Sequence, residues 1–159
     1  MPRNPRIAIG DIVYHVLNRG NGRRTIFATE KDYQHFETLL EEANALLDMR
    51  ILAYCLMPNH WHLVLYTKKD KDLSEFMRWL TTTHARHYRV KTNSIGHGHL
   101  YQGPYKSFPV DEDHYLTTVI RSVEQNPLRA RLVQKAQDWT YSSLHRRLSG
   151  TPKQKKLLA

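Results

Sequence analysis

The stretch ILAYCLMPNHWHLVLY, residues 51–66, is the most informative part of this sequence. Its first seven residues, ILAYCLM, form an apolar run of the length of a strand, and its last seven, HWHLVLY, form a second strand candidate. Only Pro58 and Asn59 separate the two. Two strands joined by a two-residue turn predict an antiparallel hairpin, and we expect the other elements to assemble around it.

Two histidines stand at the start of the second strand of this hairpin. Because alternate residues of a strand point the same way, His60 and His62 share one face while Trp61 points to the other. Two strand positions separated by one residue are roughly 6.5–7 Å apart, so both imidazoles can converge on one divalent ion. The same short pattern also suits two histidines that merely face solvent, so both interpretations remain open at this point.

Helices and strands alternate on either side of the hairpin. The apolar spacing predicts strands at 12–18 and 106–110 and helices at 30–48, 73–90 and 111–126, the last ending before Pro127. The element order is β-α-β-β-α-β-α. This order predicts an α+β fold of the ferredoxin-like kind, with an antiparallel sheet and helices packed on it. We expect a single domain over residues 1–148 and a basic, flexible tail over 149–159.

The composition limits the possible functions. The 159 residues hold 24 Lys+Arg and 15 Asp+Glu, a formal charge of +9, which suits a polyanionic partner such as nucleic acid. No apolar run reaches the roughly 18–20 residues that span a bilayer. The single cysteine, Cys55, excludes an intrachain disulfide and is expected to be a buried apolar residue. No signal-peptide pattern is present at the N-terminus, so we expect a cytoplasmic protein.

The positive charge gathers in one part of the chain. No acidic residue occurs between Glu75 and Asp111, where cations alternate with aromatic residues. Such a mixture suits single-stranded nucleic acid, although a solvated helix followed by a polar loop would look similar. The DNA-binding candidates in this window are Arg78, Arg86, Arg89, Lys91, Tyr101, Tyr105 and Lys106, and those near the first turn are Arg19, Arg23 and Arg24.

The predicted helix over 111–126 carries a polar stripe beside its apolar one. Ser122 and Asn126 are four residues apart and share a face, and Tyr115 lies seven residues before Ser122 on about the same side. Asn126 could add an oxygen ligand to the two histidines, which favours Mg²⁺ or Mn²⁺ over structural zinc. Alternatively, Asn126 is only a helix cap before proline.

These segments together resemble the single-tyrosine HUH transposases, in particular the REP-associated tyrosine transposase branch. The resemblance rests on YHVLNRGN, LAYCLMPNHWHLVLY, LTTTHAR, HLYQGPYKSFPV, RSVEQNPLRARLV and DWTYSS, in this order. It implies a ferredoxin-like fold and a metal ion held by His60, His62 and Asn126. It also implies cleavage and rejoining of single-stranded DNA near a hairpin through a 5′-phosphotyrosine intermediate. The implied partner is single-stranded or hairpin DNA, and the protein would act as a monomer or a homodimer.

The sequence departs from the family at the nucleophile. Ser122 occupies the position at which the family has its tyrosine. Tyr115 is a poor substitute, because seven helical residues correspond to about 10.5 Å of rise. Either an engineered change has removed the tyrosine or this is a natural member that does not cleave. Whether the chain is an enzyme is therefore open. The alternative is a non-catalytic DNA-binding protein derived from a transposase, and a small metal-dependent hydrolase ranks last.

Overall fold

A four-stranded antiparallel sheet forms the centre of the molecule. The computed structural model describes residues 9–92, 99–111 and 114–158. The strands are β1 (Ile12–Arg19), β2 (Arg50–Met57), β3 (His60–Thr67) and β4 (Lys106–Val110). They lie in the order β2-β3-β1-β4, and every neighbouring pair is antiparallel. This is the ferredoxin-like order, so the predicted α+β fold and the hairpin are confirmed.

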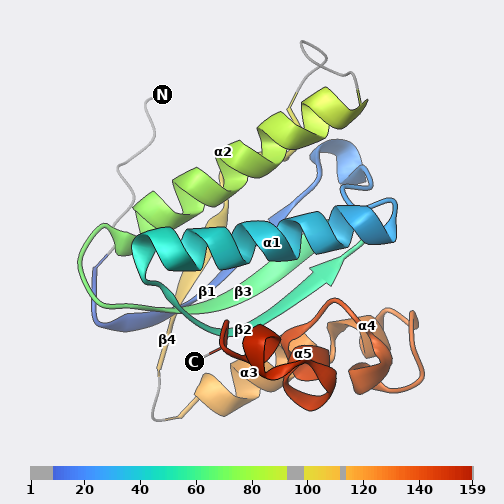
Figure 1. Ribbon diagram of the computed structural model, residues 1–159. Helices are drawn as coiled ribbons and strands as arrows, with labels where there is room; N and C mark the ends of the chain where they lie inside the picture. The colour runs from blue at the N-terminus through green and yellow to red at the C-terminus, as the bar shows by residue number, and fades with distance from the viewer. Residues whose placement is uncertain (1–8, 93–98, 112–113, 159) are drawn as a thin grey trace.

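Two long helices cover one face of the sheet. Figure 1 shows α1 (Glu30–Leu47) and α2 (Asp72–Thr92) side by side across the strands. Phe36 of α1 and Leu80 of α2 belong to the same cluster as Trp61 of β3, and all three side chains are fully buried. The larger part of the hydrophobic core therefore lies on this side.

Shorter helices gather on the opposite face. They are α3 (Leu116–Glu124) and α4 (Asn126–Arg129), whereas α5 (Ser143–Ser149) lies beside the edge strand β2, where its Arg146 forms an ion pair with Glu41 of α1. The segments η1 (Asn21–Arg23) and η2 (Ala136–Asp138) are single 3-10 turns. Val123 is buried against the sheet in a second, smaller cluster, and Leu116 and Ile120 pack on it. The predicted apolar stripe of the third helix is therefore confirmed. Across the described residues, no helix offers a stretch of apolar side chains that would span a lipid bilayer.

The third helix differs from its predicted extent. The sequence predicts one helix over 111–126, but α3 begins at Leu116, and α4 is a separate piece that begins at Asn126. Gln125 joins the two with φ −90° and ψ 0°. Pro127 lies in the first turn of α4, where no intrahelical bond needs its missing N–H. Asn126 therefore opens a helix and does not cap the end of one.

The C-terminal segment contains regular structure. Residues 151–158 include α6 (Pro152–Lys155), which begins with a capping box between Thr151 and Gln154. Leu157 is only 7% exposed, and Leu158 forms a β-bridge with Ile51 of β2. The reason is that β2 is an edge strand, whose free side takes partners from this segment.

His84 of α2 is buried in the core and hydrogen-bonded there, so its protonation is coupled to the stability of the fold. The indole Nε1 of Trp61 donates to the Tyr101 hydroxyl at 3.0 Å, and that hydroxyl contacts Nδ1 of His84. Burial lowers the pKa of His84 to about 3. The ring is therefore neutral in the folded protein.

Acid should destabilise the fold through His84. The unfolded chain takes up this proton near pH 6.5, whereas the folded chain takes it up near pH 3, so the free energy of unfolding falls as the pH drops through that window. Between pH 7 and pH 5 the loss from this group is on the order of 2 kcal/mol. In urea titrations followed by circular dichroism, His84→Gln should lose less stability than the wild type by about this amount. His114→Gln, at an exposed position, is the control. Equal losses in the wild type and His84→Gln would contradict the expectation.

Candidate metal and DNA-binding site

The two predicted histidines share a face of β3. His60 and His62 are half-buried, with ring centroids 5.2 Å apart and ring planes at 87°. Trp61 points to the opposite face, where it is fully buried in the main core. The alternation predicted from the sequence is confirmed. It places both imidazoles on the side of the sheet that carries α3 and α4.

Each histidine has one ring nitrogen engaged by a protein partner. Nδ1 of His60 lies 2.8 Å from Oδ1 of Asn59, and Nδ1 of His62 lies 3.0 Å from Nε2 of His15. In both rings Nε2 is the nitrogen that remains for a ligand. A partner on the second nitrogen is what orients metal-binding histidines in proteins.

His15 is a site residue that the sequence does not reveal. Its ring stacks on that of His62, with centroids 5.2 Å apart and planes at 27°. The register of β1 against β3 pairs His15 with Val64 and Leu17 with His62, so His15 is a diagonal neighbour of His62. Alternation in β1 shows which face His15 occupies, but only the strand register shows that it meets His62.

Electrostatics keep the histidines neutral. Burial lowers the pKa of His60, and the charge of Arg19 lowers it further. Burial lowers the pKa of His62 to about 3, with smaller contributions from the neighbouring histidines and Arg129. Neutral imidazole is the form of histidine that binds metal ions.

Ser122 lies at the surface and is held by an arginine of the next helix. Nη2 of Arg129 donates to the Ser122 carbonyl at 2.7 Å and approaches the Ser122 hydroxyl at 3.4 Å. The same guanidinium is one cause of the lowered pKa of His62, so its charge acts on Ser122 and His62 together. The sequence reasoning missed Arg129.

Asn126 and Tyr115 occupy different places relative to Ser122. Asn126 is half-buried and opens α4, one turn before Arg129. Tyr115 is the N-cap of α3, is 60% exposed and lies about two turns from Ser122. Among the described residues, no group of three or more His, Cys, Asp or Glu side chains is placed to hold a metal ion.

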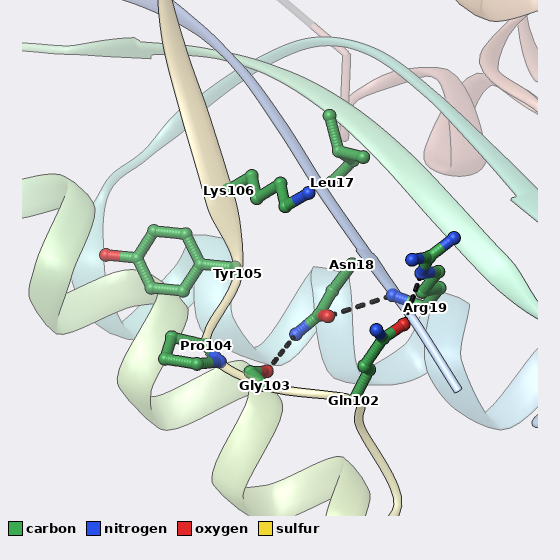
Figure 2. A pocket seen from close by; sticks show the side chains of 8 residues that line it. All are labelled: Leu17, Asn18, Arg19, Gln102, Gly103, Pro104, Tyr105 and Lys106. Carbon is green, nitrogen blue, oxygen red and sulfur yellow. Dashed lines mark hydrogen bonds between the residues drawn. The ribbon is translucent and has the colours of Figure 1, made fainter. Parts of the chain in front are cut away.

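Several predicted DNA-binding residues line adjoining cavities around Gln102. The first cavity, of about 500 Å³, is lined by Leu17, Asn18, Arg19, Gln102, Gly103, Pro104, Tyr105 and Lys106 (Figure 2). A second, of about 600 Å³, lies against α2 and includes Arg86 and Arg89. A third, of about 340 Å³, includes Arg19 and Arg23. Gln102 lines all three cavities, so these side chains surround one part of the surface.

The remaining predicted DNA-binding residues lie elsewhere or are engaged within the protein. Arg78 lines a further cavity near Leu47, which shares Thr82 and Arg86 with the second cavity but does not include Gln102. Arg24 is half-buried, and Lys91 forms an ion pair with Asp32. Tyr101 is 8% exposed, and its hydroxyl bonds within the core, so its ring does not stand at the surface where a base could stack on it. Cys55 is fully buried, as expected.

The fold is similar to two solved structures. One is a REP-associated tyrosine transposase bound to a REP hairpin, with a TM-score of 0.74 and 17% identity over 100% of this chain and 89% of that one. The other is a candidate transposase from Deinococcus radiodurans, with a TM-score of 0.53 and 18% identity over 79% of this chain and 95% of that one. Identities this low show a shared fold. A comparison with curated proteins found no match.

A family model covers most of the same region. The model of the family described as "Transposase IS200 like" matches residues 8–126. This range contains the whole sheet, both histidines of β3, Ser122 and Asn126. Because the match extends over more than half of the sequence, this chain belongs to the IS200-like transposase family.

Proposed function

We propose that this protein binds single-stranded DNA beside a hairpin and holds a divalent metal ion, Mg²⁺ or Mn²⁺, but does not cut the strand. The observation that carries the proposal is the pair of neutral imidazoles of His60 and His62, each with Nδ1 engaged and Nε2 left for a ligand. The family, whose members use a divalent metal, and the fold shared with a hairpin-bound transposase support it. A cytoplasmic location agrees with action on DNA.

The residues present fit a metal ion of this kind. His60 and His62 would supply two nitrogens, and the Asn126 amide oxygen would supply a third, harder ligand. His15 would hold the ring of His62 through Nδ1 and so direct Nε2 outwards. Bound here, a divalent ion would withdraw charge from a neighbouring phosphate oxygen and make its phosphorus more open to attack.

Ser122 is the reason we expect this chain to bind DNA without cutting it. A phenol loses its proton near pH 10, far more readily than an aliphatic hydroxyl, and a tyrosine reaches further from the helix than a serine. Arg129 beside residue 122 would favour an anion there, either a phenolate or a DNA phosphate. With Ser122, the guanidinium remains in place but the nucleophile is short and hard to ionise.

A second candidate function is DNA binding that needs no metal ion at all. The observation that favours it is the exposed Ser122 together with the cation-lined cavities around Gln102. In that case His60 and His62 would be retained from an ancestor that cleaved DNA and would no longer bind a metal ion. The two candidates differ in whether DNA binding depends on His60 and His62.

Restoring tyrosine should restore cleavage. Ser122→Tyr is expected to form a covalent protein–DNA adduct with hairpin-flanked single-stranded DNA when Mg²⁺ or Mn²⁺ is present, whereas the unchanged chain forms none. Denaturing gels measure the adduct. Ser122→Phe, which has the ring without the hydroxyl, is the matched control and should form no adduct. An adduct formed by the unchanged chain, and lost in Tyr115→Phe, would instead make Tyr115 the nucleophile.

Metal binding should depend on the histidine face. Bound Mn²⁺ loses its sharp electron paramagnetic resonance signal, so titration of the protein reports affinity without any catalysis. We expect His60→Ala with His62→Ala to abolish binding and His15→Phe to weaken it about 10- to 100-fold. His15→Gln keeps a polar partner for His62 and should recover part of the affinity. His114→Ala, at an exposed position, should bind as the wild type does; unchanged binding in the double variant would exclude this metal site.

The affinity for DNA should depend on the positive charge of Arg86 and Arg89 in α2. Arg86→Gln with Arg89→Gln removes two cations from one cavity, so hairpin DNA should bind at least about tenfold more weakly, with a shallower dependence on salt. Fluorescence anisotropy at several salt concentrations measures both. Lys153→Gln with Lys155→Gln removes the same charge from α6 and is the control. Full affinity in the histidine double variant would favour metal-independent DNA binding.

A further inference from the structure

The cavity between β1 and the segment before β4 is held in shape by hydrogen bonds. Nδ2 of Asn18 donates to the Gly103 carbonyl at 3.0 Å, and Oδ1 of Asn18 accepts from the backbone N–H of Arg19 at 2.8 Å. The backbone N–H of Gln102 donates to the Arg19 carbonyl at 3.0 Å. Asn18 is only 7% exposed. The cavity in Figure 2 is therefore built by a buried side chain that ties its two walls together.

One wall of this cavity continues the histidine face of the sheet. In the register of β1 against β3, Leu17 stands opposite His62 and Arg19 stands opposite His60. Side chains directly opposite each other on neighbouring strands lie on the same face, with Cβ atoms about 4.5–5.5 Å apart. The charge of Arg19 also contributes to the lowered pKa of His60. A molecule bound at the histidines would therefore border the cavity.

The lining offers separate features for a phosphate and for a base. Arg19 and Lys106 carry positive charge, no carboxylate is among the described lining residues, and neither cation forms a salt bridge within the described chain. Leu17, Pro104 and the ring of Tyr105 supply apolar and aromatic surface. A volume of about 500 Å³ falls within the roughly 300–1,000 Å³ typical of small-ligand sites.

Gln102 is hydrogen-bonded to Arg19 at the edge of the cavity. Its Oε1 accepts a hydrogen bond from Nε of Arg19, and Figure 2 shows its side chain rising toward Arg19. With the oxygen engaged, the amide NH₂ is the part of Gln102 that remains for another partner. The two terminal nitrogens of the Arg19 guanidinium remain for a phosphate.

We propose that this cavity is the subsite for one nucleotide of single-stranded DNA, the one next to the phosphate at His60 and His62. Its base lies against Leu17 and Pro104, the Gln102 amide donates to an acceptor on the base edge, and Arg19 and Lys106 bind its phosphates. This inference rests on the proposed DNA-binding function and deepens it, because it assigns a base preference to one position of the strand.

Replacing one base at a time tests the subsite. A hairpin DNA with a single-stranded flank is prepared with an abasic site at each flank position in turn, and the affinity of each for the wild type and for Gln102→Ala is measured by fluorescence anisotropy. At one position the loss of the base should weaken binding to the wild type about five- to tenfold and binding to Gln102→Ala far less. Gln102 is exposed, so its truncation removes no core packing. Gln134→Ala, also exposed, is the matched control and should respond as the wild type does.

A neutral phosphate linkage tests the second half of the subsite. A methylphosphonate next to the identified base should weaken binding to the wild type but not to Arg19→Gln, which already lacks the cation. If the wild type binds the hairpin DNA but neither Gln102 nor Arg19 couples to a particular position, the subsite is overturned and the proposed function stands. If the wild type does not bind this DNA at all, the proposed function itself is overturned.

Discussion

The buried hydrogen bond from the Trp61 indole to the Tyr101 hydroxyl is the constraint on which the rest of the site depends. Trp61 is enclosed between the sheet and α1, so β3 has a single register. A slip of one residue would move Trp61 to the other face and turn both histidines into the core. The bond also joins β3 to the segment that leads into β4, and through His84 it joins α2. The same two buried hydrogen bonds therefore help to position the histidines of β3, the cavity beside Gln102 and helix α2.

The second requirement is that α3 stays close to the histidine face, and buried polar contacts provide this. Glu124, at the end of α3, accepts from the Ser143 hydroxyl and from the Arg147 guanidinium of α5. Arg147 also donates to the Leu52 carbonyl of β2 at 3.1 Å. Because a buried carboxylate left without partners is costly, this set of bonds holds the end of α3 against the edge of the sheet. The break at Gln125 then lets α4 turn so that Arg129 reaches back to Ser122.

Local patterns predicted the fold and the face of the sheet on which each histidine of β3 lies. The period of two in HWHLVLY gives the face of each histidine without any knowledge of neighbours, and the apolar stripe of α3 follows from its own spacing. What the local patterns did not show depends on contacts between distant residues. His15 meets His62 only through the strand register, the Tyr101 hydroxyl bonds to Trp61 and His84, and Leu158 bridges to the free edge of β2. No pattern within a short window carries such information.

The exposure of Ser122 has a consequence for how this lineage can evolve. Its side chain contributes nothing to the core, and the contact that holds the segment uses mainly its backbone carbonyl, which every amino acid has. Tyrosine and serine codons differ by a single base. Under the proposed function, a single base change at this codon would therefore remove the nucleophile and leave the fold and the histidine face unchanged. The proposed loss of the nucleophile therefore has no cost in folding, because the side chain at position 122 lies at the surface.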